Sequence, residues 1–153
     1  MPDMAIEKIL LAVGPGDADR VDALAETLTD IAIPTGAEVV LAHVFTEEEY
    51  ESTLENLGVE AGGDVSADEV SRRHATIRQL SEALDDAGID YTVRGEIGNH
   101  GQRIVDLAEA EGTDLVIVGG RKRSPTGKAV FGSTAQEVML SAPCPVTFVR
   151  GDE

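Results

Sequence analysis

The sequence predicts an α/β protein built on a five-stranded parallel sheet with helices on both faces. Short apolar runs of strand length alternate along the chain with segments in which apolar residues recur at helical spacing. Most of the helical segments are followed by a glycine or a proline, which marks their ends. Strands that alternate with helices are typical of parallel sheets, because each strand needs a crossover connection before the next can run in the same direction.

The five expected strands are mostly apolar, as strands buried on both faces of a sheet must be. They cover residues 6–13, 38–45, 89–94, 114–118 and 146–149. Helices are expected over residues 21–32, 66–87, 99–111 and 133–140. Ser66 and Glu69 have the spacing of a capping box, and Asn99 is a favourable N-cap. The acidic range 46–65 has little periodicity and is expected to be a loop with at most a short helical turn.

The length of the chain, 153 residues, predicts a single domain over residues 1–153. Hydrophobic residues make up 42% of the chain, which favours a packed core over disorder. No apolar run approaches the roughly 20 residues that a membrane-spanning helix needs. The first residues, Met1 to Met4, lack the basic segment that opens a signal peptide. We therefore expect a cytoplasmic protein with no membrane association.

The chain is strongly acidic, with a formal net charge of -17. Residues 21–71 contain no Lys or Arg at all. Duplex nucleic acid is not expected as a partner, because its phosphates would be repelled by most of this surface. A globular chain with such a charge is typical of proteins that work at high salt, where charge is screened and favours solubility. We therefore hypothesise that the source is a halophile.

One stretch, residues 115–136, departs from this acidity because it contains no Asp or Glu. It begins with an apolar run that ends in Gly119-Gly120, and it then carries four cations: Arg121, Lys122, Arg123 and Lys128. A helix is expected to start directly after it. A strand end, a basic loop and a helix N-terminus bring backbone N–H groups and side-chain cations to one place. The stretch therefore predicts an anion site.

Two segments of the sequence match nucleotide-binding motifs only in part. The segment from Gly14 begins like a dinucleotide fingerprint, but its third glycine position holds Asp19. A tight turn with Asp17 or Asp19 as a helix cap is expected there instead. Gly127-Lys128 resembles the end of a P-loop, but two of the other residues which that motif requires differ. Neither a Rossmann dinucleotide site nor a Walker-type NTPase is expected.

No catalytic or metal-binding constellation is visible in the sequence. Cys144, the single cysteine, lies between two prolines and is interpreted as a small hydrophobic residue. His43 falls in an apolar strand and is interpreted as a core residue. His74 and His100 have no partner that the sequence reveals. We assign no catalytic residues and no metal ligands.

The basic loop also carries a more specific pattern, in which Gly119 is followed at fixed spacing by Gly132 and Ser133. This resembles the universal stress protein family, whose signature is Gly-x2-Gly-x9-Gly-[Ser/Thr] at the same place in a five-stranded α/β fold. The resemblance covers nearly the whole chain. It includes the stretches 8–13 and 40–44, the Gly95 region after the third strand, and the ending 143–146. It implies the strand order 3-2-1-4-5.

The resemblance implies a site for ATP or another adenine nucleotide, with Mg²⁺ only if ATP is bound. The first glycine of the signature and its neighbours contact ribose and phosphates in family members that bind ATP, and the final Gly-Ser holds phosphate at a helix N-terminus. Carried over by position, the contacts fall on Val118, Gly119, Arg121, Lys122, Gly132, Ser133 and Thr134. The adenine side falls on Ala12, Val13 and Val44, next to Gly14.

Two residues depart from the pattern of the family. Lys122 replaces the second glycine of the signature, so its side chain either blocks a backbone contact to phosphate or replaces that contact with its ammonium. Gly14 replaces an Asp that contacts the nucleoside in binders. The loop can also be purely structural, since Ser133 with Gln136, or Thr134 with Glu137, reads as an ordinary capping box.

Three functions therefore stay open at the level of the sequence. The leading one is a non-enzymatic stress-response protein that senses or holds an adenine nucleotide. The first alternative is a nucleotide-free interaction or chaperone-like module, and the weakest is a slow ATPase or phosphotransferase, for which Asp17 is only a loose Mg²⁺ candidate. A homodimer is expected through the last strand, Val146–Arg150, because an apolar strand at a sheet edge invites pairing with another copy. The resemblance implies the same dimer.

Overall fold

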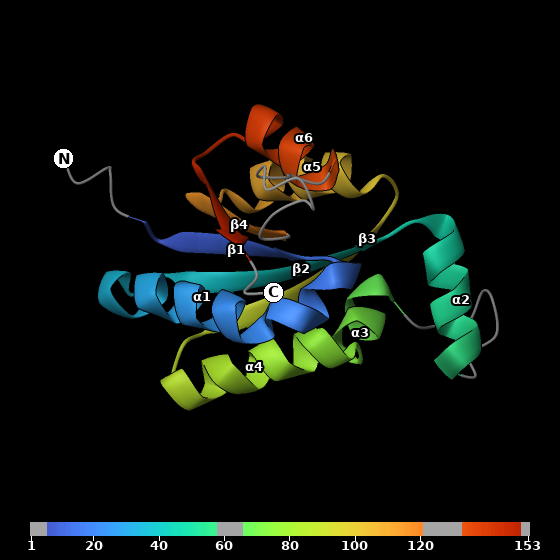
Figure 1. The fold of residues 1–153 in the computed structure, drawn as a ribbon, viewed down its shortest axis with the longest axis horizontal. Helices are drawn as coiled ribbons and strands as arrows, with labels where there is room; N and C mark the ends of the chain where they lie inside the picture. The colour runs from blue at the N-terminus through green and yellow to red at the C-terminus, as the bar shows by residue number, and fades with distance from the viewer. Residues whose placement is uncertain (1–5, 58–65, 121–132, 151–153) are drawn as a thin grey trace, which may run out of the picture.

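The five predicted strands form one parallel sheet in the order β3-β2-β1-β4-β5, which confirms the predicted fold class. The computed structural model describes residues 6–57, 66–120 and 133–150 (Figure 1). The strands are β1 (Lys8–Val13), β2 (Glu38–Phe45), β3 (Tyr91–Ile97), β4 (Leu115–Gly120) and β5 (Val146–Arg150). Strand β1 lies at the centre, where Leu11 is in register with both Leu41 and Ile117.

Helices cover both faces of the sheet. Figure 1 shows α1 (Val21–Thr35), α3 (Ala67–Arg72) and α4 (Ala75–Ala87) on one side, and α5 (His100–Glu111) and α6 (Ser133–Ser141) on the other. A short 3-10 helix, η1 (Pro15–Arg20), joins β1 to α1. Helix α2 (Glu47–Leu57) stands at one end of the molecule, after β2. Among the described residues, no helix is long and apolar enough to cross a membrane.

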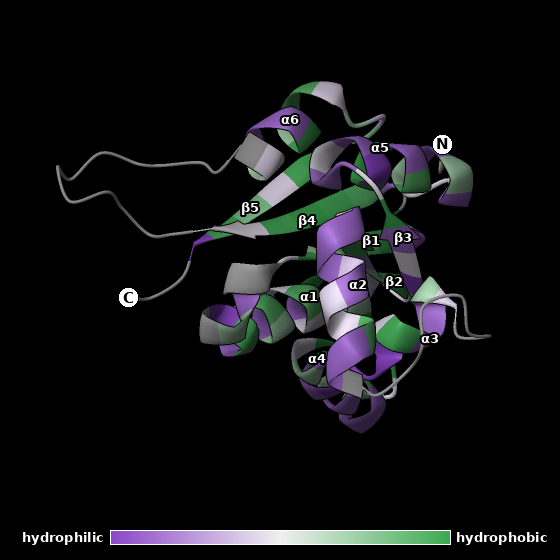
Figure 2. Ribbon diagram, turned by 90° about the vertical axis from the view of Figure 1, so that its right-hand side faces the viewer, coloured by the Kyte–Doolittle hydropathy of each residue, from purple (hydrophilic) through white to green (hydrophobic). Residues whose placement is uncertain are grey.

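The alternation of side chains along each strand produces two cores. Ile9, Leu11 and Val13 of β1 belong to the core beneath α1 and α4, together with Leu24, Leu28, Ile77, Leu80 and Leu84 of those helices. Leu10 and Ala12 point to the opposite face and pack with Ile104, Leu107 and Val138 of α5 and α6. Because both faces are covered, the central strands read as continuous apolar runs rather than alternating ones. Figure 2 shows this for β4, which has the green of hydrophobic residues over most of its length.

The helix ends follow the predicted signals. Ser66 Oγ accepts a hydrogen bond from the N–H of Glu69 at 3.1 Å, and Asn99 Oδ1 accepts one from Gln102 at 3.0 Å. Three helices end at glycines with left-handed backbone conformations: Gly36, Gly88 and Gly112, with φ of 70°, 71° and 63°. A side chain at any of the three would be strained there, so glycine fixes where these helices stop.

Two predictions about local structure are wrong. The range 46–65, expected to be a loop, contains helix α2, which begins with a capping box between Thr46 and Glu49. Its Leu54 packs with Phe45 and Val70, so tertiary contact supports a helix with weak periodicity. The predicted helix over residues 66–87 is two helices, because His74 interrupts it and caps α4 through Nδ1, which accepts from Thr76 N–H. Residues 58–65 lie outside the described part of the chain.

Candidate functional site

The carboxyl ends of β1, β2 and β4 meet at one edge of the sheet, where ligands bind in proteins of this architecture. The order of strands reverses next to β1, because β2 lies on one side of it and β4 on the other. Gly14 follows β1 directly, and Gly119 is near the end of β4. The predicted site residues of both strands therefore lie at the topological switch point of the sheet.

The apolar residues predicted for the adenine side divide between the two faces of the sheet. Ala12, Val44 and Val118 are buried on the face covered by α5 and α6, where they share a core with Ala135 of α6. Val13 is also buried but points to the opposite face, beneath α1. The first three residues thus belong to one apolar wall that also includes Ala135 of α6, and Val13 is separated from them by the sheet.

The turn after β1 is held by a carboxylate. Asp17 Oδ2 accepts a hydrogen bond from the N–H of Gly14 at 2.7 Å, and Asp17 Oδ1 accepts one from Arg20 Nε at 2.9 Å. Both side chains are largely buried, with 6% of Asp17 and 10% of Arg20 exposed. Helix α1 begins only after Arg20, whose side chain makes no cap bond, so neither Asp17 nor Asp19 is the N-cap of α1. The predicted turn is present as η1, and Asp17 caps it through its bond to the N–H of Gly14.

The ion pair between Asp17 and Arg20 lies directly against Gly119. A Cβ added to Gly119 would lie 2.9 Å from Asp17 Oδ1 and 3.1 Å from Arg20 Cδ. The absence of a side chain at this position is therefore what allows the pair to sit on the end of β4. Sequence analysis missed Arg20, although its i,i+3 spacing from Asp17 right after a strand was a signal that could have found it.

The electrostatics of this pair are mixed. Burial raises the pKa of the Asp17 carboxyl above its usual range, while the N–H of Gly14 and the charge of Arg20 act in the opposite direction. Arg20 brings a cation to the strand ends of a very acidic protein, and it does so next to the first glycine of the predicted signature. The arrangement can hold an anionic group or a ribose hydroxyl, since guanidinium donates and carboxylate accepts hydrogen bonds.

A cluster of histidines lies beside this turn, on the end of β2. His43 is buried, and its Nδ1 lies 3.0 Å from the carbonyl oxygen of Val13, so Nδ1 carries the proton and donates. The His43 ring lies 4.5 Å from the ring of His74 and 4.4 Å from that of Phe45, measured between centroids. The interpretation of His43 as a core residue is confirmed. The contact with His74 was not visible in the sequence, because His43 lies on a strand and His74 at a helix N-cap, and the two meet only in the folded protein.

The surroundings of His43 and His74 disfavour the charged form of each ring. Burial lowers the pKa of His43 to about 4, and the nearby charge of His74 contributes in the same direction. Burial also lowers the pKa of His74. His100, at the start of α5, contacts Glu49 Oε1 of α2 through Nε2 at 2.8 Å, and so joins two distant segments. Within the described residues, no group of three or more His, Cys, Asp or Glu could hold a metal ion.

Part of the predicted site lies outside the described residues. Arg121, Lys122 and Gly132 belong to the range 121–132, and the side chain of Ser133 is not described either. The main chain of Ser133 begins helix α6, and Thr134 in its first turn is half-buried. The described part of the site is therefore the strand ends, the turn with its ion pair, and the start of α6.

Residues 5–150 match the model of the universal stress protein family. This match covers nearly the whole chain, so the chain belongs to that family. A universal stress protein from Mycolicibacterium smegmatis is 28% identical to it over 89 residues, which are 58% of this chain and 68% of that protein.

Solved structures share the fold. A universal stress protein in complex with cAMP is similar with a TM-score of 0.67 and 18% identity, over 97% of this chain and 99% of that chain. The universal stress protein from Archaeoglobus fulgidus in complex with dAMP is similar with a TM-score of 0.60 and 20% identity, over 94% of this chain and 98% of that chain. The strand order described above is thus a property of the family and not a peculiarity of this chain.

Proposed function

We propose that this chain is a non-enzymatic stress-response protein that binds an adenine nucleotide at the carboxyl edge of β1 and β4. Membership of the family supports the stress-response role. Two structures of the same fold hold cAMP and dAMP, which supports an adenine nucleotide as the ligand. ATP is the form expected from the resemblance of the signature, and Mg²⁺ would accompany it only as the counter-ion of its phosphates.

The observation that carries the proposal is the ion pair against Gly119. Asp17 lies three residues beyond Gly14, where binders of the family carry an Asp, and it delivers a carboxylate to the end of β1 all the same. In the proposed complex, Asp17 accepts from a ribose hydroxyl and Arg20 donates to a phosphate oxygen. Ala12, Val44 and Val118 form the apolar wall, and the start of α6 at Ser133 and Thr134 supplies N–H groups.

The test has two arms, both on the whole chain. Mass spectrometry of the purified and then denatured protein detects a nucleotide that co-purifies with it. Titration calorimetry with ATP, AMP and cAMP in molar KCl measures affinity, and Arg20→Gln is expected to weaken binding at least about tenfold. Arg103→Gln is the matched control, because Arg103 forms an ion pair of the same i,i+3 spacing with Asp106 on α5. The proposal is wrong if no nucleotide co-purifies with the protein and calorimetry detects no binding of ATP, AMP or cAMP.

A second candidate function is a nucleotide-free interaction module. Its support is that the space above Gly119 is already occupied by Asp17 and Arg20. In that case, Arg20 would be satisfied by its own carboxylate and Lys122 would close the remaining approach. The calorimetric experiment separates the two functions. ATP turnover that survives Lys122→Glu and Ser133→Ala would indicate a contaminating enzyme rather than catalysis by this chain.

We also propose that the chain forms a homodimer through β5 and that its acidity is an adaptation to high salt. Strand β5 is an edge of the sheet, and Leu140 on the neighbouring helix α6 is 79% exposed. Light scattering in molar KCl tests the dimer, and a monomer alone contradicts it. Urea midpoints measured from low to molar KCl test the adaptation, and stability that falls as KCl rises contradicts it.

A further inference from the structure

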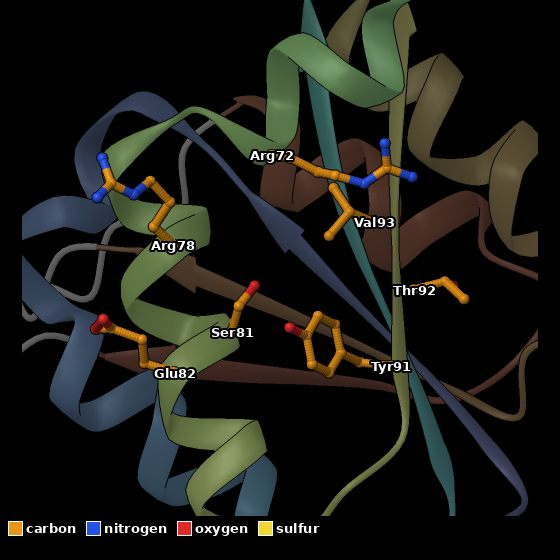
Figure 3. A pocket seen from close by; sticks show the side chains of 7 residues that line it. All are labelled: Arg72, Arg78, Ser81, Glu82, Tyr91, Thr92 and Val93. Carbon is orange, nitrogen blue, oxygen red and sulfur yellow. The ribbon is translucent and has the colours of Figure 1, made fainter.

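A groove of about 510 Å³ lies between α4 and β3, which is the edge strand of the sheet opposite β5. Figure 3 shows the seven residues that line it: Arg72, Arg78, Ser81, Glu82, Tyr91, Thr92 and Val93. Tyr91 and Val93 point from β3 towards α4, and Thr92 points to the other side of the strand. The groove is separate from the proposed nucleotide site at β1 and β4, and what it binds does not depend on that site.

One half of the outer edge of β3 is covered by a helix, and the other half is not. The N–H of Val39 bonds to the oxygen of Asp90, and the N–H of Gly98 bonds to the oxygen of Phe45. Because the main chain of a strand alternates in direction, the groups of Tyr91, Val93 and Gly95 point away from the sheet. Helix α3 covers the half at Gly95. The half at Tyr91 and Val93 opens into the groove.

The half of the edge that α3 covers shows which kind of group can accept a hydrogen bond from its outward N–H groups. The N–H of Gly95 donates to Asp68 Oδ1 of α3 at 2.6 Å, so an acidic side chain of the chain itself already caps one outward N–H. Among the described residues, none accepts a hydrogen bond from the outward N–H of Tyr91 or Val93. An unpaired row of this kind is a template for an added strand.

The groove holds two arginines that are not paired with carboxylates. Lys8, Arg20, Arg94 and Arg103 each form an ion pair with a carboxylate. Four other described arginines have no ion-pair partner among the described residues: Arg72, Arg73, Arg78 and Arg150. Of these four, Arg72 and Arg78 line the groove, where two cations meet one carboxylate, that of Glu82. In Figure 3 the side chain of Arg72 runs beside Val93 to the edge of β3, and Arg78 stands at the rim on α4.

We propose that the groove binds an extended peptide rich in Asp and Glu, which adds as a strand to the open half of β3. The main chain of the peptide bonds to the outward groups of Tyr91 and Val93. Alternate side chains of a strand point to the same face. Acidic side chains of the peptide face Arg72 at the edge of β3 and Arg78 at the rim on α4, and Ser81 and Tyr91 also line the groove.

The test uses a fluorescein-labelled peptide in which Glu alternates with Val and Thr, and measures its fluorescence anisotropy with the full chain. The KCl concentration is the lowest at which circular dichroism shows a folded protein, because salt screens exposed charges. Arg72→Gln combined with Arg78→Gln is expected to weaken binding at least about tenfold. Arg73→Gln is the matched control, since Arg73 is adjacent in sequence and does not line the groove, and it is expected to leave affinity within about twofold.

Two further probes separate strand addition from simple charge attraction. A peptide of the same sequence with alternate N-methylated amides keeps the charge but loses the N–H groups, and it is expected not to bind. The amide resonances of Tyr91 and Val93 are expected to shift on addition of the unmodified peptide. The proposal is overturned by any of four results: no binding of the unmodified peptide, equal binding of a Lys-for-Glu peptide, equal loss from Arg73→Gln, or full binding of the N-methylated peptide.

Discussion

Gly95 on β3 and Gly119 on β4 are both glycines against which another segment packs, but what each one faces differs. A Cβ at Gly95 would collide with the main-chain carbonyl of Ala67 in α3 and lie 2.5 Å from Ser71 Oγ. A Cβ at Gly119 would instead meet the side chains of Asp17 and Arg20, at 2.9 and 3.1 Å. Each contact has a carboxylate on a main-chain N–H beside it, from Asp68 in the first case and Asp17 in the second.

The difference separates a fixed contact from an adjustable one. Main chain in a helix cannot move without moving the helix, so the contact at Gly95 is part of the architecture. The side chains of Asp17 and Arg20 can turn away when a ligand or a methyl group arrives. Substitution of Gly119 is therefore expected to affect ligand binding, and substitution of Gly95 is expected to affect the stability of the fold.

Gly95→Ala is expected to have the largest effect on stability. The methyl group has no room against the carbonyl of Ala67, and either β3 or α3 must shift. We expect a loss of about 3–4 kcal/mol in the free energy of unfolding, at the upper end for overpacked sites. Urea unfolding followed by circular dichroism measures it. A loss below about 1 kcal/mol would show that α3 is as adjustable as the pair at Gly119.

The second prediction concerns His43, which stands between the two contacts because it is in register with Val13 on one side and Gly95 on the other. Its pKa is lowered to about 4 in the folded protein, from 6.5. The folded state thus binds the proton less tightly than the unfolded chain. Stability is complete above about pH 6.5 and decreases as pH falls towards 4, by about 2–3 kcal/mol.

His43→Asn is expected to remove most of this pH dependence. Asn keeps an N–H donor near the place of Nδ1, so the bond to the carbonyl of Val13 can persist without a titrating group. Urea midpoints at pH 7.5 and pH 5 measure the difference between the two proteins. His100→Gln is the control, because His100 is partly exposed and bonds to Glu49. If the pH dependence were unchanged in His43→Asn, its origin would lie instead at His74, whose pKa is also lowered by burial.

The third prediction is that Arg20→Gln measures how much the Asp17–Arg20 pair against Gly119 contributes to the free energy of unfolding. The substitution leaves a buried Asp17 carboxyl without its cation, and removing one partner of a buried pair is costly. We expect a loss of about 2 kcal/mol, which is less than for a fully unpaired carboxylate because the N–H of Gly14 still donates to Asp17. Arg103→Gln breaks an exposed pair at 3.5 Å and is expected to cost under about 0.5 kcal/mol. Urea unfolding of both variants at pH 7.5 measures the losses, and equal losses would contradict the buried character of the Asp17–Arg20 pair.

The sequence was sufficient for the architecture because the signals for it are local. Apolar runs marked the strands, and Ser66 and Asn99 marked helix starts that the structure confirms. Helix α2 was missed although Thr46 and Glu49 have capping-box spacing, because the packing of its Tyr50 and Leu54 against Phe45 exists only in the folded protein. Likewise, β3 continues past Arg94 to Ile97, because Gly95 does not break a strand that α3 covers.

The site was less predictable, because its members come from separate segments. Ala12, Gly14 and Gly119 could be placed at the strand ends from the order of the strands. Arg20 lies one turn beyond the residues that the family signature marks, and its position over Gly119 depends on how η1 folds back. The contact of His43 with His74 joins a strand to a helix cap that was expected to be the middle of a helix. No local pattern carries information of that kind.

Apart from the control Arg103→Gln, the smallest expected effect on stability is that of Gly119→Ala. The methyl group meets Asp17 Oδ1 and the stem of Arg20, both of which can rotate away, so we expect a loss of about 1 kcal/mol in the free energy of unfolding. The displaced guanidinium and the methyl group then occupy the space proposed for ribose and phosphate. Nucleotide affinity, measured by calorimetry, is therefore expected to fall at least about tenfold while stability changes little. If affinity and stability instead fell together by amounts similar to those for Gly95→Ala, Gly119 would be a second fixed contact, and the space above it would not be available to a ligand.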